Sequence, residues 1–332
     1  MSYHANEQRY DTMTYRHAGS SGLCLPAVSL GLWHNFGGAA TRERMQALCF
    51  TAFDAGITHF DLANNYGPPP GSAEENFGRI LKEELHAYRD ELIISTKAGY
   101  DMWQGPYGSG GSRKYLLASL DQSLLRMGIP YVDIFYHHRM TPDTPLEESM
   151  LALDAAVKSG RALYAGLSNY DAPTMQRAAA ILQELHCPFV INQNSYSILN
   201  RGAEHSGILD AAQAGGKGMI IFSPLSQGLL SDRYLDGIPA DSRIRTDGRF
   251  LKESSLTPAM LQKLRALQQL ARERGQTLAQ MALAWVFSHP AVTSVLIGAS
   301  RPEQITENIA MLQNTSFSEA EYQQIERIAL CE

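Results

Sequence analysis

The sequence predicts an α/β fold, a closed (β/α)₈ barrel of the TIM type, on three observations. Short apolar runs alternate with longer helical segments along most of the 332 residues. Runs such as Leu92–Ile94 and Met219–Phe222 are apolar at every position, which is typical of parallel strands covered on both faces. Eight such strand–helix units favour a closed barrel over an open doubly wound sheet. Because barrels of this length fold as one unit, we expect a single domain over residues 1–332.

The predicted strands and helices follow one another in a regular order. Strands are predicted at Ala27–Trp33, His59–Ala63, Glu91–Lys97, Tyr131–His138, Ala162–Ser168, Phe189–Gln193, Gly218–Ser223 and Val292–Gly298. Helices are predicted at Thr41–Ala55, Ser72–Glu84, Ser112–Met127, Leu146–Ser159, Ala172–Leu185, Ser206–Ala214, Pro258–Arg274 and Pro302–Leu312. Thr41 and Ser112 suit the N-caps of two of these helices, and Gly56 and Gly128 suit their C-terminal ends.

Three segments lie outside this repeat. Tyr15–Pro26 contains Gly-Ser-Ser-Gly and is predicted to form a hairpin that caps the floor of the barrel. Ser226–Leu256 is a long insert rich in Gly, Asp, Arg and Ser, and long loops in compact domains are commonly functional. Ser318–Leu330 is predicted to be a C-terminal helix that begins at a Ser318 cap.

The composition excludes several classes of partner and site. The net charge is −6 and no run of five or more basic residues occurs, which argues against nucleic acid or an anionic membrane as a partner. Residues 1–15 lack the apolar core of a signal peptide, and no apolar stretch approaches the length of about 18 residues expected of a membrane span. We therefore expect a cytoplasmic protein with reduced thiols and no bound metal, because its cysteines are scattered without disulfide or metal-ligand spacing. The cysteines are Cys24, Cys49, Cys187 and Cys331.

Polar residues close most of the predicted strands, and in barrels of this type the chemistry sits at the C-terminal strand ends. Successive members of the set lie 25 to 41 residues apart, which suits one strand–helix unit each. Their side chains should therefore converge at one mouth of the barrel. The set is Asp61, Lys97, His138, Ser168, Gln193 and Ser223.

Asp61 and Lys97 at neighbouring strand ends predict a buried ion pair, which on its own is as compatible with a structural salt bridge as with catalysis. Tyr66, five residues beyond Asp61 on a loop able to fold over the mouth, favours catalysis. A phenol has a pKa of about 10, and a nearby ammonium group is expected to lower it and make the phenol a better acid. His138 is placed to hydrogen-bond a carbonyl oxygen. The four groups together predict a site that polarises a carbonyl group.

These segments resemble the successive motifs of the aldo-keto reductase family, over a stretch from about residue 15 to residue 312. Within the family, the chain is similar to the branch that includes bacterial L-glyceraldehyde-3-phosphate reductases and the β-subunits of voltage-gated potassium channels, on Ser29–Gly37 and Asn65–Glu74. The family motifs are matched by Asp61–Gly67, Ser95–Lys97, Val132–His138, Gly166–Asn169, Val295–Arg301 and Glu307–Asn308.

The resemblance implies NADPH-dependent reduction of small aldehydes to alcohols. It makes Tyr66 the general acid and gives Lys97, paired with Asp61, the role of tuning it. His138 is the histidine implied to hold the substrate carbonyl, because it stands five residues after Asp133 as the family motif requires.

The cofactor implied by the resemblance is NADPH or NADP⁺, lying extended across the barrel mouth. No G-x-G-x-x-G follows a strand, so a Rossmann site is not supported. The resemblance places Ser168, Asn169 and Gln193 on the nicotinamide carboxamide and Phe222 against its ring, and it places Ser223, Pro224 and Leu225 along the pyrophosphate. Ser300 is expected to cap a helix that starts at Pro302, whose N-terminus suits an anion. The remaining cofactor positions are Trp33, Arg233, Arg243, Gly298, Gln304 and Asn308.

The substrate side of the site is predicted from the loops at the mouth. Trp33, Trp103 and Tyr66 are expected to wall a narrow site that admits small aldehydes. Arg139 can attract a substrate phosphate or carboxylate, and an arginine there can equally be a structural ion-pair partner. The resemblance also implies a homo-oligomer, a tetramer or a larger assembly.

Two other functions compete with reduction of aldehydes. One is an aldolase-like barrel enzyme in which Lys97 forms a Schiff base with the substrate. The other is an NADPH-binding regulatory or redox-sensing subunit like the potassium channel β-subunits. In that branch the His138 position is often Asn, so the histidine here favours turnover.

Overall fold

Eight parallel strands close into a barrel in a computed structural model that describes residues 3–240, 242–248 and 251–330. Each strand pairs with the next along the chain, and the last pairs with the first, Val295 with Val28, to close the ring. The predicted fold class is therefore confirmed. The barrel strands are β3 (Val28–Gly31), β4 (His59–Asp61), β5 (Ile93–Ala98), β6 (Val132–His137), β7 (Ala162–Ser168), β8 (Phe189–Ser195), β9 (Gly218–Phe222) and β10 (Val292–Ile297).

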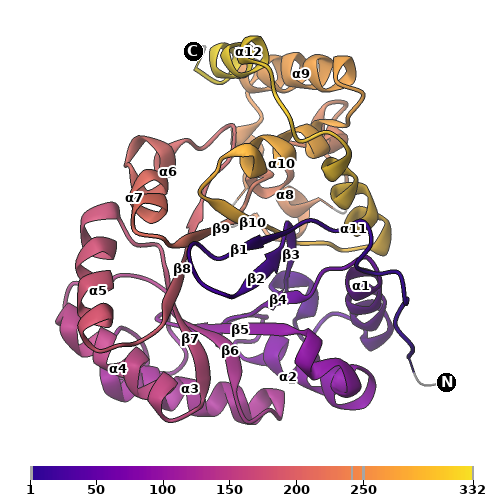
Figure 1. Ribbon diagram of the computed structural model, residues 1–332. Helices are drawn as coiled ribbons and strands as arrows, with labels where there is room; N and C mark the ends of the chain where they lie inside the picture. Colours follow the sequence, from indigo (N-terminus) through magenta and orange to yellow (C-terminus); the bar gives the residue numbers. More distant parts are fainter. Residues whose placement is uncertain (1–2, 241, 249–250, 331–332) are drawn as a thin grey trace.

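Helices surround the barrel in a ring, as Figure 1 shows. The predicted caps are confirmed: Thr41 Oγ1 accepts from the Arg44 N–H, and Gly128 ends a helix with φ of 68°. The helices are α1 (Arg42–Asp54), α2 (Ser72–Ile80), α3 (Arg113–Met127), α4 (Leu146–Lys158), α5 (Ala172–Glu184), α6 (Gly202–His205), α7 (Ile208–Ala214), α8 (Arg243–Thr246), α9 (Pro258–Glu273), α10 (Leu278–Ser288), α11 (Pro302–Ile309) and α12 (Glu319–Leu330). Short 3₁₀ or π turns are η1 (His34–Phe36), η2 (Leu81–Leu85), η3 (His86–Glu91), η4 (Ser226–Gly228), η5 (Asp232–Tyr234), η6 (Glu253–Ser255) and η7 (Ala310–Gln313).

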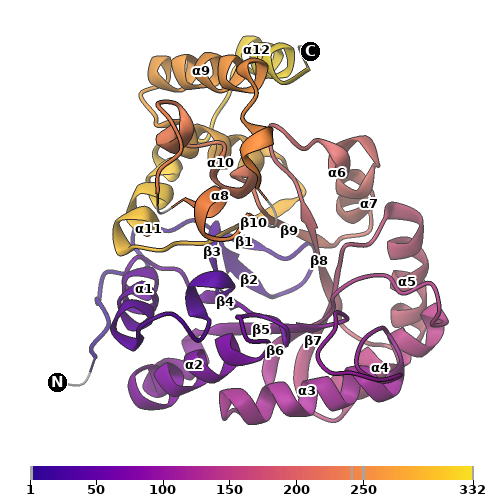
Figure 2. The ribbon, with the colours of Figure 1, turned by 180° about the vertical axis from the view of Figure 1, so that it is seen from behind.

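An antiparallel hairpin, β1 (Tyr15–His17) and β2 (Cys24–Pro26), covers one end of the barrel, as predicted. The Ser20 N–H donates to the Gly216 carbonyl just before β9 begins. Ala18, Leu23 and Leu25 pack in one buried cluster with side chains from the barrel interior. The hairpin faces the viewer in Figure 1, and the segment that carries α8 faces the viewer in Figure 2, which shows the opposite side.

Helix α10 is the longest described element that was not predicted from the sequence. Eight of its 11 residues are buried, so it lacks the polar face that marks a surface helix. Its start does carry a recognisable signal, a capping box in which Thr277 and Gln280 bond each other's backbone N–H groups. Two predicted helices also differ. The helix predicted at Ser206–Ala214 begins at Ile208 instead, because Gly207 at its start has φ of 71°, and a separate short helix, α6, ends at His205. The α-helical part of Ser72–Glu84 ends at Ile80 and continues as a π turn.

The C-terminal helix α12 lies beside α9, away from the ring of helices, as both views show. Lys263 Nζ donates to the Ala329 carbonyl across this pair. The predicted cap is present, since the Glu321 N–H donates to Ser318 Oγ. Within the described ranges, no helix has both the length and the apolar composition needed to cross a membrane.

Candidate active site

The C-terminal strand ends bring the predicted polar residues to one mouth of the barrel. In the strand register Asp61 is paired with Ser95, and Ser168 with Gln193. Gln193 Nε2 donates to Asp61 Oδ1 over 3.1 Å, although the two residues lie on strands from opposite halves of the chain. The convergence predicted from strand spacing is therefore confirmed for these residues.

Lys97 is fully buried and its ammonium group faces three acceptors. Nζ forms an ion pair with Asp61 and donates to the Leu62 carbonyl at 2.8 Å and to the Tyr66 hydroxyl at 3.4 Å. Burial lowers the pKa of Lys97, and the Asp61 carboxylate opposes that shift. Because its three N–H donors are directed at protein acceptors, the amine is poorly arranged for Schiff-base chemistry, which disfavours the aldolase-like alternative.

Tyr66 is half-buried and lies over Lys97, whose Nζ is 5.0 Å from the centre of the phenol ring. Burial raises the pKa of Tyr66 well above its usual range, and the Asp61 carboxylate adds to the rise. The net pKa shift is therefore upward, opposite to the lowering expected from the ammonium group, because desolvation of the phenolate dominates in the resting site. Tyr66 is therefore a protonated phenol at neutral pH and can donate its proton.

His138 stands against Tyr66, with ring centres 6.1 Å apart and the rings inclined by 70°. Burial lowers the pKa of His138 well below its usual range, and the positive charge of Lys97 acts in the same direction. Its Nδ1 atom is buried and has no hydrogen-bond partner among the described residues. A neutral imidazole in this place has one N–H to offer to a carbonyl oxygen.

Three uncharged side chains predicted to hold the nicotinamide lie beside these four groups. Ser168 Oγ donates to the Gln193 carbonyl at 3.0 Å, and Asn169 Nδ2 donates to the His138 carbonyl at 3.0 Å. Asn169 adopts φ of 57°, the left-handed conformation that asparagine tolerates better than most residues. Ser168, Asn169 and Gln193 thus lie within hydrogen-bond distance of one another or of the catalytic candidates.

The segment after β9 turns sharply at the mouth. Ser223 has φ of 53°, and its hydroxyl accepts from Gln227 Nε2 at 2.9 Å. Phe222, at the end of β9, packs against the buried cluster that fills the barrel interior. Pro224 is buried and Leu225 half-buried behind the turn.

The predicted contacts near the adenosine end lie at the start of α11 and on the long insert. Ser300 does not cap α11: the N-cap is Arg301, without a side-chain bond. Instead Gln304 Oε1 accepts from the backbone N–H of Ser300 at 2.8 Å and its hydroxyl at 3.2 Å. Gly298 is exposed just before this point and Asn308 is buried on the same helix. Arg233 lies half-buried in η5, and the side chain of Arg243 lies outside the described residues.

The predicted substrate residues divide into two groups. The ring centres of Trp33 and Tyr66 are 5.9 Å apart, so Trp33 lies beside the catalytic candidates. Trp103 is 37% exposed and packs on Tyr115, 5.3 Å away, rather than on the catalytic candidates. The Arg139 side chain is more than one-third exposed. Its ion pair with the highly exposed Asp101 carboxylate is long, at 3.9 Å, and therefore weak.

Two further aromatic residues belong to the site. Tyr100 meets His138 edge-on at 4.7 Å and lies under the Arg139 guanidinium at 4.4 Å. Tyr136 is fully buried, 5.5 Å from Lys97 Nζ. Their positions in the sequence could have indicated them. Tyr136 precedes His138 by two residues, so both side chains point to the same face, and Tyr100 follows Lys97 by three residues.

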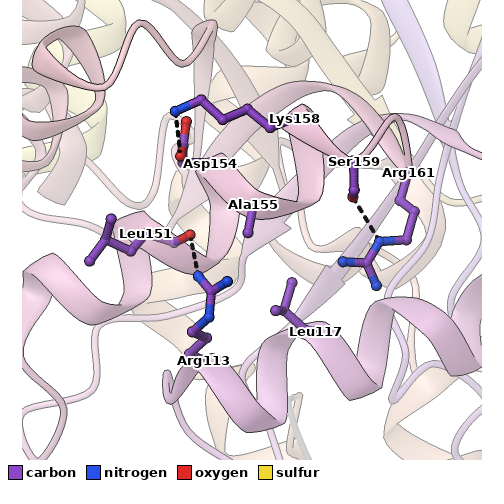
Figure 3. Close-up of a pocket in the computed structure, with 8 residues that line it drawn as sticks. All are labelled: Arg113, Leu117, Leu151, Asp154, Ala155, Lys158, Ser159 and Arg161. Carbon is purple, nitrogen blue, oxygen red and sulfur yellow. Dashed lines mark hydrogen bonds and ion pairs between the residues drawn. The ribbon is translucent and has the colours of Figure 1, made fainter.

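A surface hollow of about 590 Å³ lies elsewhere, on the outer helices (Figure 3). Its polar side chains bond one another or the backbone, as in the Lys158–Asp154 ion pair at 2.9 Å and the Arg113 bond to the Leu151 carbonyl. It contains none of the predicted site residues. Among residues 3–240, 242–248 and 251–330, no group of three or more His, Cys, Asp or Glu side chains is arranged to hold a metal ion.

Comparison with known proteins identifies the family of this chain. The profile of the Aldo/keto reductase family matches residues 27–330. The chain is 59% identical over 330 residues to the L-glyceraldehyde 3-phosphate reductase of Escherichia coli (strain K12), covering 98% of this chain and 95% of the relative. It is 35% identical over 305 residues to a probable voltage-gated potassium channel subunit beta of Oryza sativa subsp. japonica, covering 90% and 91%.

A solved structure of an aldo-keto reductase has the same fold. The thermostable aldo-keto reductase Tm1743, in complex with the inhibitor epalrestat, superposes with a TM-score of 0.75 at 29% identity, covering 95% of this chain and 100% of that one. The family profile, the sequence identity over nearly the full length and this structural match all assign the chain to one family. It belongs to the aldo/keto reductase family.

Proposed function

We propose that this enzyme uses NADPH to reduce small aldehydes, with glyceraldehyde 3-phosphate and methylglyoxal-like compounds as its substrate class. The observation that carries the proposal is the Tyr66 hydroxyl, 3.4 Å from a fully buried Lys97 Nζ and beside the neutral ring of His138. One proton donor, one cation and one neutral hydrogen-bond donor at a single mouth are the groups that reduction of a carbonyl requires.

The nearby uncharged side chains fit the nicotinamide end of NADPH. A carboxamide has an acceptor oxygen and two N–H donors, and it needs a partner set that offers both kinds of group. Ser168, Asn169 and Gln193 together offer hydroxyl and amide groups at the mouth, next to the catalytic candidates. Phe222 adds an aromatic ring at the end of β9. When bound, NADPH would supply the hydride that reaches the carbonyl carbon.

Tyr66 completes the reaction at the oxygen. As the carbonyl oxygen gains negative charge, the phenol O–H donates its proton to it, and the O–H bond of Tyr66 breaks while that of the alcohol forms. The phenolate that remains lies beside the Lys97 ammonium, which stabilises it. His138 donates one N–H to the same oxygen and keeps the carbonyl group oriented.

The preference for phosphorylated aldehydes is proposed from Arg139. Its guanidinium stands one residue beyond His138, is partly exposed and lies over Tyr100. A guanidinium binds a phosphate through paired N–H donors. Arg139 Nε donates to the Gly99 carbonyl at 3.1 Å, and the weak contact with Asp101 leaves the terminal N–H groups available for that role. The Escherichia coli relative is named for glyceraldehyde 3-phosphate, which agrees with this preference.

Steady-state NADPH oxidation over a panel of aldehydes and ketones tests the proposal. We expect glyceraldehyde 3-phosphate and methylglyoxal to give higher kcat/KM than steroid ketones, because Trp33 and Tyr66 narrow the site. Activity should persist in EDTA, since no metal is part of the proposed reaction. An Arg139→Gln variant should lose more kcat/KM with the phosphorylated aldehyde than with methylglyoxal. A panel in which a steroid gave the highest kcat/KM would refute the proposed substrate class.

A further inference from the structure

A chain of hydrogen bonds through the barrel interior ends on Asp61. Ser95 Oγ lies 2.8 Å from Asp61 Oδ1, and His59 Nε2 lies 2.9 Å from Ser95 Oγ. On the other side of the imidazole, Ser29 Oγ lies 2.8 Å from His59 Nδ1, and Ser294 Oγ lies 2.6 Å from Ser29 Oγ. All five side chains are fully buried. The chain therefore crosses from β10 to the catalytic candidates without contact with solvent.

The strand periodicity builds this arrangement. His59 and Asp61 are two residues apart on β4, and Ser95 and Lys97 are two apart on β5, so each pair points to the same face. The pairing of Asp61 with Ser95 brings the two strands into register. The interior positions one layer below the Asp61–Lys97 pair are thus polar, where a barrel core is usually filled by branched apolar residues.

The directions of the bonds follow from which groups can donate. A carboxylate only accepts, so the Ser95 hydroxyl donates to Asp61 and its oxygen accepts from His59 Nε2–H. A neutral imidazole carries one N–H, so His59 Nδ1 accepts from the Ser29 hydroxyl. Burial lowers the pKa of His59 to about 4, against the attraction of the Asp61 carboxylate, so the ring is neutral near pH 7.

We propose that His59 is a positioning residue for the Asp61–Lys97 pair and acts through Ser95, which rests on the function proposed above. Because His59 Nε2–H donates to Ser95 Oγ, the hydroxyl hydrogen of Ser95 is free to donate in the other direction, to Asp61. The carboxylate is then held by Ser95, by Gln193 Nε2 at 3.1 Å and by Lys97. A fixed carboxylate in turn holds Lys97 Nζ where it stabilises the phenolate of Tyr66.

Three variants separate this role from simple core packing. We expect Ser95→Ala to lower kcat about tenfold, because Asp61 loses one hydrogen bond to its charged group, with the Kd for NADPH unchanged. His59→Leu should have a similar effect, because it frees the Ser95 hydroxyl to turn away from Asp61. His59→Gln keeps an N–H that can reach Ser95, so its kcat should stay within about threefold of wild type. The double variant His59→Leu/Ser95→Ala should be no slower than the slower single variant, because the two residues act in one chain.

Ile220→Val provides the matched control, since Ile220 is a fully buried side chain of the barrel interior outside the hydrogen-bond chain. It should lower the melting temperature and leave kcat at the wild-type value. If His59→Leu behaves like this control, with a lower melting temperature and normal kcat, His59 is only a core residue and the proposal is wrong. Equal losses of kcat in His59→Leu and His59→Gln would also overturn it.

A readout without turnover distinguishes failure of this inference from failure of the proposed function. The ¹⁵N shifts of His59 in the intact protein at pH 7 should be those of the neutral tautomer protonated at Nε2. The Nδ1-protonated tautomer would leave Ser95 without its donor and would refute the positioning role, whatever the protein reduces. If the wild-type protein reduces no aldehyde and His59 is protonated at Nε2, the proposed function fails and the hydrogen-bond chain stands.

Discussion

At the scale of the residue, the contact between Tyr66 and Lys97 decides what the site can do. The phenol is held protonated by burial, and the Lys97 ammonium, which is within hydrogen-bond distance of it, is itself fully buried. In the structure the ammonium group is neutralised by Asp61, and in the proposed reaction it faces a new phenolate. The Lys97 ammonium is therefore already in place for the negative charge that would develop on the Tyr66 oxygen. Charges fixed in advance in this way lower the activation barrier of a reaction.

The first prediction is that Tyr66→Phe removes the acid and leaves the ring. General acid catalysis is typically worth about 10²–10⁴-fold, so kcat should fall by at least about a hundredfold. The Kd for NADPH, measured by quenching of tryptophan fluorescence, should stay near wild type. Tyr107→Phe, which changes a tyrosine that is 52% exposed, serves as the matched control and should be fully active. A Tyr66→Phe enzyme within a few-fold of wild type would show that Tyr66 is not the acid.

The second prediction concerns Lys97→Met. This change leaves the Asp61 carboxylate buried without its cation, and breaking a buried pair typically costs about 3–5 kcal/mol of stability. We expect a lower melting temperature and, for the protein that remains folded, a kcat at least about a hundredfold below wild type. Lys82→Met, at an exposed lysine, should change neither. Normal turnover by folded Lys97→Met would remove Lys97 from the mechanism.

Sequence reasoning identified the residues at strand ends and missed those one layer below. Asp61, Lys97 and His138 end predicted strands, so the rule that polar strand ends converge was enough to bring them together. His59 and Tyr136 lie inside strands, where the rule gives no reason to distinguish a functional side chain from core. The direction of the Tyr66 pKa could not be read from sequence either, because it depends on how far the mouth excludes water.

At the scale of the element, the strands were easier to predict than the helices. Each predicted strand overlaps an observed one, because short, largely apolar runs at regular spacing have few other interpretations. Helix α10 was missed because it is buried on most sides, and its capping box was the remaining signal. The insert between β9 and α9 was predicted to be irregular, and its described residues from Ser226 onward form only short helical turns, among them α8.

The third prediction tests what this insert contributes to cofactor choice. If Arg233 contacts the 2′-phosphate of NADPH, Arg233→Gln should weaken NADPH binding by about 10–100-fold, because a charge-assisted hydrogen bond is lost. NADH has no 2′-phosphate, so its binding should be unchanged. Arg245→Gln is the matched control, because Arg245 lies on the same insert and pairs with Glu253 at 3.3 Å. Fluorescence titration with both cofactors provides the measurement. Equal losses of affinity for NADPH and NADH would show that Arg233 does not bind the 2′-phosphate.

At the scale of the whole molecule, the closed barrel explains why residues far apart in sequence share one site. It also leaves three neutral histidines in or beside the interior, His59, His137 and His138. Burial lowers the pKa of His137 to about 3 and that of His59 to about 4, and it lowers that of His138 well below the usual range. The same closure that excludes water from the chemistry therefore makes stability depend on pH.

The last prediction follows from the sign of these shifts. A histidine whose pKa is lower in the folded state contributes its full stability above the unfolded value of about 6.5 and loses it as the pH falls toward the folded value. Urea unfolding should therefore show a marked loss of stability between pH 7 and pH 5. His59→Gln removes one of these groups, so its loss over that interval should be smaller by roughly 2 kcal/mol. His86→Gln, at an exposed histidine, should follow the wild-type curve. If His59→Gln loses as much stability as wild type, His59 is not the group that resists protonation, and the neutral ring assigned to it in the folded protein is wrong.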